Sequence, residues 1–264
     1  MARPNVLILR APGTNCDAET AFAFESAGAK AEVLHINRLL DDPGRCSRFQ
    51  IFCIPGGFSY GDDVAAGRIL GNQIRHHLAR QLAEFKAAEK LILGICNGLQ
   101  VLIKSGVLLD PDPEKGPPVT LTWNDSGKFE DRWVRLAVRG NRSVFLEGIE
   151  SMYLPVAHAE GKFVARDREV LGELESGGQL ALRYRPLCGG GDADQAEGVP
   201  YPDNPNGSMA DTAGICDTTG RVLGMMPHPE RHIDPTQHPR WTRGEAGARG
   251  DGTKVFANAV AYFA

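Results

Sequence analysis

A cysteine flanked by two glycines is the residue whose type and spacing most clearly predict chemistry in this chain. Cys96 lies in Gly94-Ile95-Cys96-Asn97-Gly98, between an apolar strand-like run and a run with helical spacing. A sharp strand-to-helix turn crowds the backbone, so glycines at plus and minus two relieve collisions, as in the G-x-S-x-G nucleophile elbow. The positive end of a helix also favours thiolate over thiol. The spacing predicts a nucleophilic Cys96, and a small buried hydrophobe is the alternative.

A histidine and a carboxylate follow a second strand-like run, residues 220–226. They lie in Pro227-His228-Pro229-Glu230. An imidazole takes a thiol proton near neutral pH and returns it to a leaving amine, and a carboxylate two residues away can orient the ring. The pattern predicts a triad of Cys96, His228 and Glu230. His158 and His232 are rival bases, and a histidine that caps a turn is the structural alternative.

Paired glycines follow a third strand-like run, residues 49–54, in Pro55-Gly56-Gly57. Such glycines leave backbone N–H groups free to point into a cleft, and the tetrahedral oxyanion of acyl transfer needs preorganised donors. We expect the amides of Gly57 and Asn97 to supply them. A plain turn at a strand end is the alternative.

The elements that must position these residues alternate in the first third of the chain. Strand-like runs at residues 6–9, 31–35 and 49–54 alternate with a helix over 17–27 and precede a long amphipathic helix over 70–88, which leads into 90–95. Parallel strands joined by helices end at one edge of a sheet, where ligands bind in open α/β folds. We expect an α/β fold with a mostly parallel, doubly wound sheet and flanking helices, as one domain over 1–264.

The second half of the chain has a different pattern. Shorter β-like runs at residues 133–138, 169–174 and 180–184 predict a smaller antiparallel section packed beside the first sheet. Residues 111–118 and 188–206 are rich in Gly, Pro and Asp and predict surface loops. A polar stretch over 241–252 precedes a final helix over 255–263.

Composition limits the classes of function. The chain has 264 residues, a formal net charge of −4 and 42% hydrophobic residues, which suits a large globular domain and argues against a nucleic-acid groove or a polybasic membrane patch. Its 6 cysteines form no C-x-x-C pair, and we expect no metal site. No apolar run approaches the roughly 20 residues of a membrane helix, and the N-terminus has no signal-peptide pattern. We therefore expect a cytoplasmic protein.

These motifs together resemble those of class I glutamine amidotransferases, in which a G-x-C-x-G-x-Q elbow and a later P-x-H-P-E segment release ammonia from glutamine. Further segments are similar to those of the family members that supply ammonia to a synthetase of purine biosynthesis. These segments span nearly the whole chain: Pro12-Gly13-Thr14-Asn15-Cys16-Asp17, Gly57-Phe58-Ser59-Tyr60-Gly61-Asp62-Asp63, His158-Ala159-Glu160-Gly161-Lys162 and Asn204-Pro205-Asn206-Gly207-Ser208.

The resemblance implies a class I glutamine amidotransferase fold and a glutaminase in which Cys96 forms a γ-glutamyl thioester, His228 is the base and Glu230 orients it. Gly56 and Gln100 are then expected to contact glutamine, or Gln100 to steady the site as a buried polar residue. The ammonia would pass to a separate synthetase that uses ATP and Mg, since the chain has no G-x-x-x-x-G-K-[ST] loop. The chain itself would need no cofactor, and a third small subunit is a further candidate partner.

Two other classes of protein stay open at this stage. A stand-alone Cys-His hydrolase would share the elbow but not the 57–63 segment, and a non-catalytic binding subunit would have no need of cysteine, histidine and glutamate together. Asn206 and Ser208 fit either a surface turn or a contact near the ammonia exit. The stretches at 188–198 and from 111 differ from the family's pattern and leave the mode of partner docking open.

Overall fold

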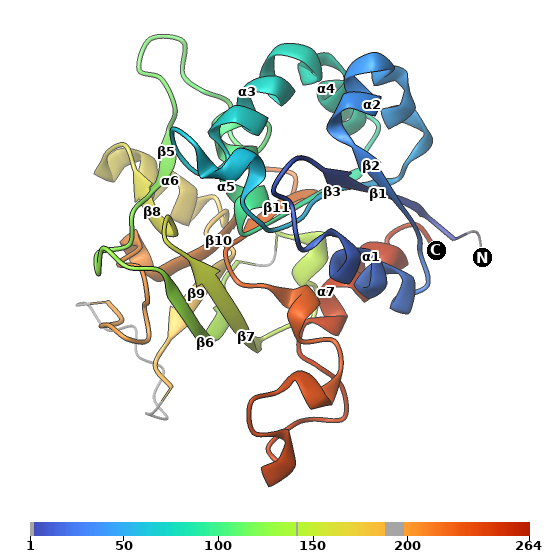
Figure 1. The fold of residues 1–264 in the computed structure, drawn as a ribbon. Helices are drawn as coiled ribbons and strands as arrows, with labels where there is room; N and C mark the ends of the chain where they lie inside the picture. The colour runs from blue at the N-terminus through green and yellow to red at the C-terminus, as the bar shows by residue number, and fades with distance from the viewer. Residues whose placement is uncertain (1–2, 141, 188–197) are drawn as a thin grey trace.

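The computed structural model describes residues 3–140, 142–187 and 198–264. Within them one sheet contains, in chain order, β1 (Asn5–Arg10), β2 (Lys30–His35), β3 (Ile51–Ile54), β4 (Leu91–Ile95), β6 (Glu130–Val138), β7 (Ser151–His158), β9 (Leu182–Arg185), β10 (Thr212–Cys216) and β11 (Val222–Met225). Their order across the sheet is β2-β1-β3-β4-β11-β10-β9-β6-β7 (Figure 1). A separate two-stranded sheet pairs β5 (Val119–Thr122) with β8 (Lys162–Ala165).

The helices cover both faces of the parallel half of the sheet. Those around the parallel strands are α1 (Asp17–Ser26), α2 (Ile36–Asp41), α3 (Arg68–His77), α4 (Ala79–Ala87), α5 (Asn97–Ser105) and α7 (Thr253–Ala261), whereas α6 (Arg168–Ser176) packs beside β8 (Figure 1). Figure 1 shows α1 and α7 on one side of β1 and β3, with α3 and α4 on the other. The rings of Phe24 on α1 and Phe256 on α7 meet edge to face at 4.8 Å. Within the described residues, no helix has the length and apolar character to cross a membrane.

Four strands that carry the predicted chemistry, or lead into it, end at the same edge. β1, β3, β4 and β11 are parallel to one another, and every residue of β3, β4 and β11 is buried. Near-continuous apolar strands suit a sheet that is covered on both faces. The segments after these four strands therefore converge, which confirms the expected α/β architecture and the convergence of the three predicted motifs.

Three details of the sequence-based prediction were wrong. The antiparallel strands β10, β9, β6 and β7 continue the main sheet instead of packing beside it. Residues 169–174 lie in helix α6, whose N-terminus is capped where the Asp167 side chain accepts a hydrogen bond from the amide of Val170 at 2.9 Å. The long helix over 70–88 is two helices, because Leu78 leaves the helical region at φ −120°.

The predicted loops are only partly described. Residues 111–118 contain a turn in which the backbones of Asp112 and Gly116 exchange hydrogen bonds of 2.9 Å. In the 188–206 stretch, residues 188–197 lie outside the described residues, and residues 201–206 form turns and bends.

Candidate active site

Cys96 occupies a strained turn between β4 and α5. Its φ is +51° and its ψ −105°, a backbone conformation that L-residues rarely adopt and that recurs at functional sites. The two flanking glycines are sterically required. A Cβ on Gly98 would collide with the carbonyl oxygen of Ile54, and a Cβ on Gly94 would lie 2.7 Å from the carbonyl oxygen of Gly98. The structure thus confirms the crowded elbow that the sequence predicts.

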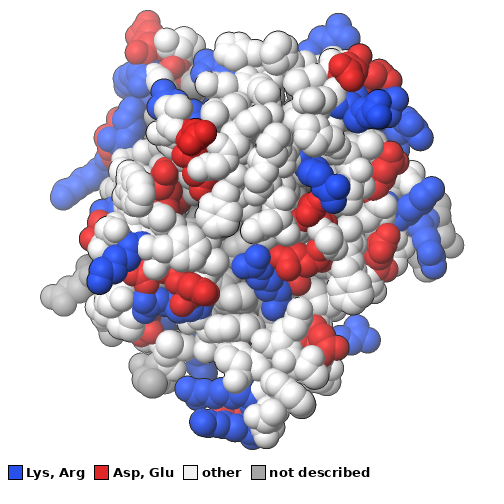
Figure 2. Space-filling view, viewed as in Figure 1, with Lys and Arg blue, Asp and Glu red and all other residues white. Residues whose placement is uncertain are grey.

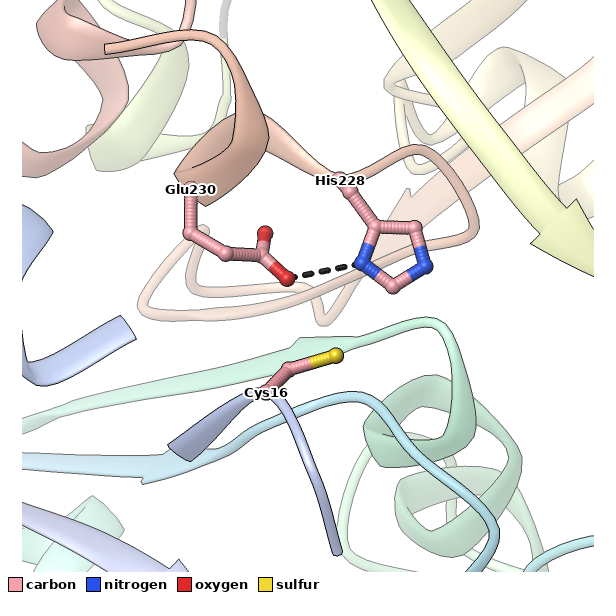
Figure 3. A group of neighbouring side chains, drawn as sticks. All are labelled: Cys16, His228 and Glu230. Atoms are coloured by element: carbon pink, nitrogen blue, oxygen red, sulfur yellow. Dashed lines mark hydrogen bonds and ion pairs between the residues drawn. The ribbon is translucent and has the colours of Figure 1, made fainter. Parts of the chain in front are cut away.

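His228 and Glu230 form a buried pair beside the elbow. Nδ1 of His228 lies 2.7 Å from a carboxylate oxygen of Glu230, and both side chains are almost fully buried (Figure 3). Burial opposes the charged imidazolium, but the Glu230 carboxylate and the nearby thiols of Cys96 and Cys16 outweigh it and raise the pKa of His228 well above its usual value. The ring is therefore held protonated, ready to give a proton to a leaving amine.

A second thiol, which the sequence motifs leave outside the predicted triad, lies next to this pair. Figure 3 shows Cys16 pointing toward the His228 ring from the segment before α1. Its Sγ lies 3.2 Å from one guanidinium nitrogen of Arg231. Another nitrogen of the same guanidinium pairs with the Glu19 carboxylate at 2.9 Å. Burial raises the pKa of Cys16 to about 11, so it stays a thiol at neutral pH. Only its Pro12–Asp17 motif after β1 signalled this position in the sequence.

Ligand atoms of Cys16, His228 and Glu230 lie within 4.8 Å of one another, which is close enough to hold a metal ion. The hydrogen bond between His228 and Glu230 uses one polar atom of each, and the Arg231 guanidinium lies against the Cys16 sulfur, while Nε2 of His228 and Oε2 of Glu230 have no hydrogen-bond partner among the described residues. The expectation of no metal site stays a prediction.

The glycine loop after β3 is held by the segment after β1. The amide of Phe58 donates to the carbonyl of Gly13 at 3.0 Å, and the amide of Cys16 donates to the carbonyl of Gly56 at 3.3 Å. Gly57 has φ +137°, and a Cβ there would lie 2.8 Å from the amide nitrogen of Asn15. Position 57 thus requires glycine for its backbone conformation and for this close approach.

A cavity of about 240 Å³ opens in front of the Cys96 elbow. Its lining residues are Gly57, Phe58, Gly61, Asp62, Cys96, Gln100, Trp123, Ala157, His158, Ala159 and Glu160. The Sγ of Cys96 lies 3.6 Å from the carbonyl oxygen of Ala157 on β7. The structure therefore brings Gly57, Cys96 and Gln100 to one cavity, as the motifs predict. Gly56 is absent from this lining, and a Cβ on it would lie 2.7 Å from Cε1 of His228.

The side chains of Asn97 and Gln100 stiffen one wall of this cavity. Nδ2 of Asn97 donates to Oε1 of Gln100 at 2.8 Å, and Nε2 of Gln100 donates to the carbonyl of Glu160 at 2.7 Å. Gln100 is therefore a buried polar residue that steadies the site, and its predicted contact with substrate stays a prediction. Asp62 accepts from Asn97 at 3.2 Å, and its burial, together with the charge of Glu160, raises its pKa to about 6.

The rival residues are less suited to the predicted chemistry. Burial, followed by the charge of His228, lowers the pKa of His158 to about 3, so His158 is a weak base. His232 lines a different groove, of about 1190 Å³, and its Nδ1 lies 2.9 Å from the carbonyl of Tyr153. Cys53 on β3 is a further thiol, outside the predicted triad; it is completely buried, which raises the pKa of its thiol well above the usual value.

Asn206 and Ser208 anchor the segment that forms another wall. Asn206 is completely buried, so the interpretation as a surface turn is wrong. Its Nδ2 donates to the carbonyl of Gly161 at 2.9 Å, and Oγ of Ser208 accepts from the amide of Phe163 at 2.9 Å. These bonds hold the chain directly after the cavity residues 157–160. A role near an ammonia exit stays a prediction.

Comparison with known proteins decides the family. Residues 3–263 match the model of the CobB/CobQ-like glutamine amidotransferase domain. The chain belongs to this family. The phosphoribosylformylglycinamidine synthase subunit PurQ of Dehalococcoides mccartyi is 48% identical to this glutamine amidotransferase over 262 residues, which cover 98% of each chain. The subunit PurQ of Methanococcus maripaludis strain C7 is 38% identical over 275 residues, 98% of this chain and 97% of the relative.

Solved structures agree with the family. A chain in the structure of PurLQS from Thermotoga maritima matches this glutamine amidotransferase with a TM-score of 0.72 and 30% identity, over 100% of both chains. Another glutamine amidotransferase from Thermotoga maritima matches with a TM-score of 0.51 at 14% identity, over 92% of this chain and 83% of the other, which shows a shared fold alone. The resemblance to class I glutamine amidotransferases, drawn from the motifs, is confirmed.

Proposed function

We propose that this chain is the glutaminase subunit of phosphoribosylformylglycinamidine synthase, which releases ammonia from glutamine for de novo purine biosynthesis. The observation that carries the proposal is the elbow thiol of Cys96, which faces a cavity beside the buried His228–Glu230 pair. The relatives named PurQ, at 48% and 38% identity over nearly the whole chain, supply the reaction and the pathway.

The proposed reaction has two halves. Cys96 attacks the carboxamide carbon of glutamine as a thiolate, its proton being held on His228, and the negative charge that develops on the carboxamide oxygen is stabilised by the amides of Gly57 and Asn97. His228 protonates the departing nitrogen, so ammonia leaves and a γ-glutamyl thioester stays on Cys96. The now neutral imidazole takes a proton from water, which attacks the thioester and releases glutamate. Glu230 orients His228 and stabilises its charged form throughout.

The partners follow from the same relatives. The assembly PurLQS joins a Q component with L and S, in accord with two partners of this chain, a synthetase and a third, small subunit. ATP and Mg are used by the synthetase in this proposal, since the sequence has no G-x-x-x-x-G-K-[ST] loop. Figure 2 shows positive and negative side chains interspersed on the face in view, which fits a partner other than nucleic acid.

A cytoplasmic location is part of the proposal. All five cysteines in the described part of the chain, Cys16, Cys46, Cys53, Cys96 and Cys216, are free thiols, as suits a reducing compartment.

The test is glutaminase activity in the assembled complex. Wild-type protein mixed with the synthetase and its small subunit is expected to produce glutamate and formylglycinamidine ribonucleotide in equal amounts. Glutamate formation without any effect of the partners would favour a stand-alone hydrolase. No glutamate formation, together with binding to the synthetase, would favour a non-catalytic subunit.

A further inference from the structure

His158 has one ring nitrogen whose proton can be assigned from its neighbours. Nδ2 of Asn124 donates to the carbonyls of Lys128 at 2.9 Å and His158 at 2.8 Å. This fixes Oδ1 of Asn124 toward Nδ1 of His158, at 3.1 Å, and toward the amide of Gly161, at 3.0 Å. An amide oxygen only accepts hydrogen bonds, so Nδ1 of His158 must carry a hydrogen.

The other ring nitrogen is then a bare acceptor. Burial, followed by the charge of His228, lowers the pKa of His158 to about 3, so near neutral pH the ring holds the one proton already placed on Nδ1. Its Nε2 therefore presents a lone pair. Within the described residues this buried atom has no hydrogen-bond partner, although buried acceptors in proteins rarely lack one.

His158 lies at the cavity in front of Cys96. It lines that cavity, and the carbonyl of the preceding residue, Ala157, is the group 3.6 Å from the Cys96 sulfur. The imidazole fits there because residue 161 is glycine: a Cβ on Gly161 would lie 2.7 Å from Nε2. The segment after it is fixed by Asn206 and Ser208. His158 is thus held on a rigid segment at the cavity in front of the reacting thiol.

The other lining groups distinguish the two nitrogens of glutamine. Asp62 and Glu160 are the charged side chains in the cavity lining, and both are acidic. A carboxylate is the better partner for the cationic α-ammonium group, which leaves the neutral acceptor for the neutral carboxamide.

We propose that Nε2 of His158 accepts a hydrogen bond from the carboxamide N–H of bound glutamine and so orients the carboxamide for attack by Cys96. This inference deepens the proposed function and rests on it. A γ-carboxylate at neutral pH has no hydrogen to donate, so the same acceptor discriminates glutamine from the product glutamate.

Two substitutions separate this role from a structural one. His158→Asn keeps a donor at the position of Nδ1, and with it the bond to Asn124, but has no atom at Nε2. His158→Gln places an amide oxygen near Nε2 but loses the donor at Nδ1. We expect His158→Asn to lower kcat/KM for glutamine about 5- to 10-fold, the range for one neutral hydrogen bond, at unchanged thermal stability, and His158→Gln to retain more activity.

The opposite result would overturn the inference. If His158→Asn keeps the wild-type kcat/KM and His158→Gln loses activity, His158 serves only to hold Asn124 in place. Ammonium-dependent synthesis by the complex is expected to be unchanged in both variants. If the wild-type complex itself shows no glutaminase activity, the proposed function fails and not the assignment of His158.

Nitrogen NMR gives a readout that does not depend on turnover. In ¹⁵N-histidine-labelled Cys96→Ala protein, the Nε2 signal of His158, assigned by its loss in His158→Asn, is expected at the position of an unprotonated nitrogen. L-Glutamine and glutaramate, which lacks the α-amino group, should both shift it, whereas L-glutamate should not. A protonated Nε2, or a shift with L-glutamate but not glutaramate, would contradict the proposal.

Discussion

Replacing Glu230 with glutamine removes one charge from the buried pair and keeps its shape. Nδ1 of His228 and the Glu230 carboxylate are 2.7 Å apart with both side chains almost fully buried, so solvent hardly screens their interaction. A hydrogen bond to a charged group contributes about 1.5–3 kcal/mol. If that stabilisation is needed to keep the imidazolium in the transition state, Glu230→Gln should lower kcat/KM about 10- to 100-fold, since each 1.4 kcal/mol is a factor of ten.

The loss should also depend on pH. In the wild type the pKa of His228 is raised, and the Glu230 carboxylate is the largest influence in that direction. Without the carboxylate, burial lowers the pKa of the His228 ring. The fraction of protonated His228 therefore falls at a lower pH in the variant than in the wild type. The deficit of Glu230→Gln relative to the wild type should therefore grow from pH 6 to pH 8.

The assay is glutamate release by the assembled complex across that pH range. Glu84→Gln is a matched control, because Glu84 is largely exposed on α4 and its bond to Arg80 is a surface pair. Wild-type kcat/KM in Glu230→Gln at all pH values, or a deficit that is larger at pH 6 than at pH 8, would refute this role of Glu230.

Three further expectations follow from the same geometry. His228→Ala should lower glutaminase kcat by about 10² to 10⁴, the range for a general acid–base group, and a smaller loss than that of Glu230→Gln would point to another base. Gly98→Ala should lower the free energy of unfolding by about 1–3 kcal/mol in a denaturant titration, because the added Cβ would collide with the carbonyl of Ile54. Gly172→Ala is the control and should not lower it, because there is open space at that position. The isolated chain should hydrolyse glutamine about 10² to 10³ times more slowly than the complex if the partner orders the Gly56–Gly57 loop into the oxyanion hole; equal rates would exclude this gating.

The catalytic elbow and the sheet around it could be predicted because local patterns determine them. Apolar strands followed by Gly-rich or Pro-rich segments place Cys96 and His228 at strand ends, and parallel strands end at one edge. A Cβ on Gly98 would collide with the backbone because the turn is tight. The position of Gly98 two residues after Cys96 already indicates such a turn.

The parts that could not be predicted depend on contacts between distant segments. The helix breaks at Leu78 although no Gly or Pro is there. Leu78 and Leu82 are both buried and four residues apart, so the sequence pattern is that of one continuous helix. The position of the proton on the His158 ring depends on Asn124, 34 residues away, and the place of Cys16 depends on Arg231, 215 residues away. Helix α6 was the avoidable error, because the Asp167 cap is readable in the sequence.

The most direct test of the central claim follows the amide nitrogen of glutamine. The complex is supplied with glutamine labelled with ¹⁵N in the carboxamide, formylglycinamide ribonucleotide, ATP and Mg, with either the wild-type chain or Cys96→Ala. We expect ¹⁵N in the product with the wild type, none with Cys96→Ala, and full synthesis by the Cys96→Ala complex from added ammonium. Labelled product from the Cys96→Ala complex, or no transfer of ¹⁵N by the wild type, would contradict the central claim.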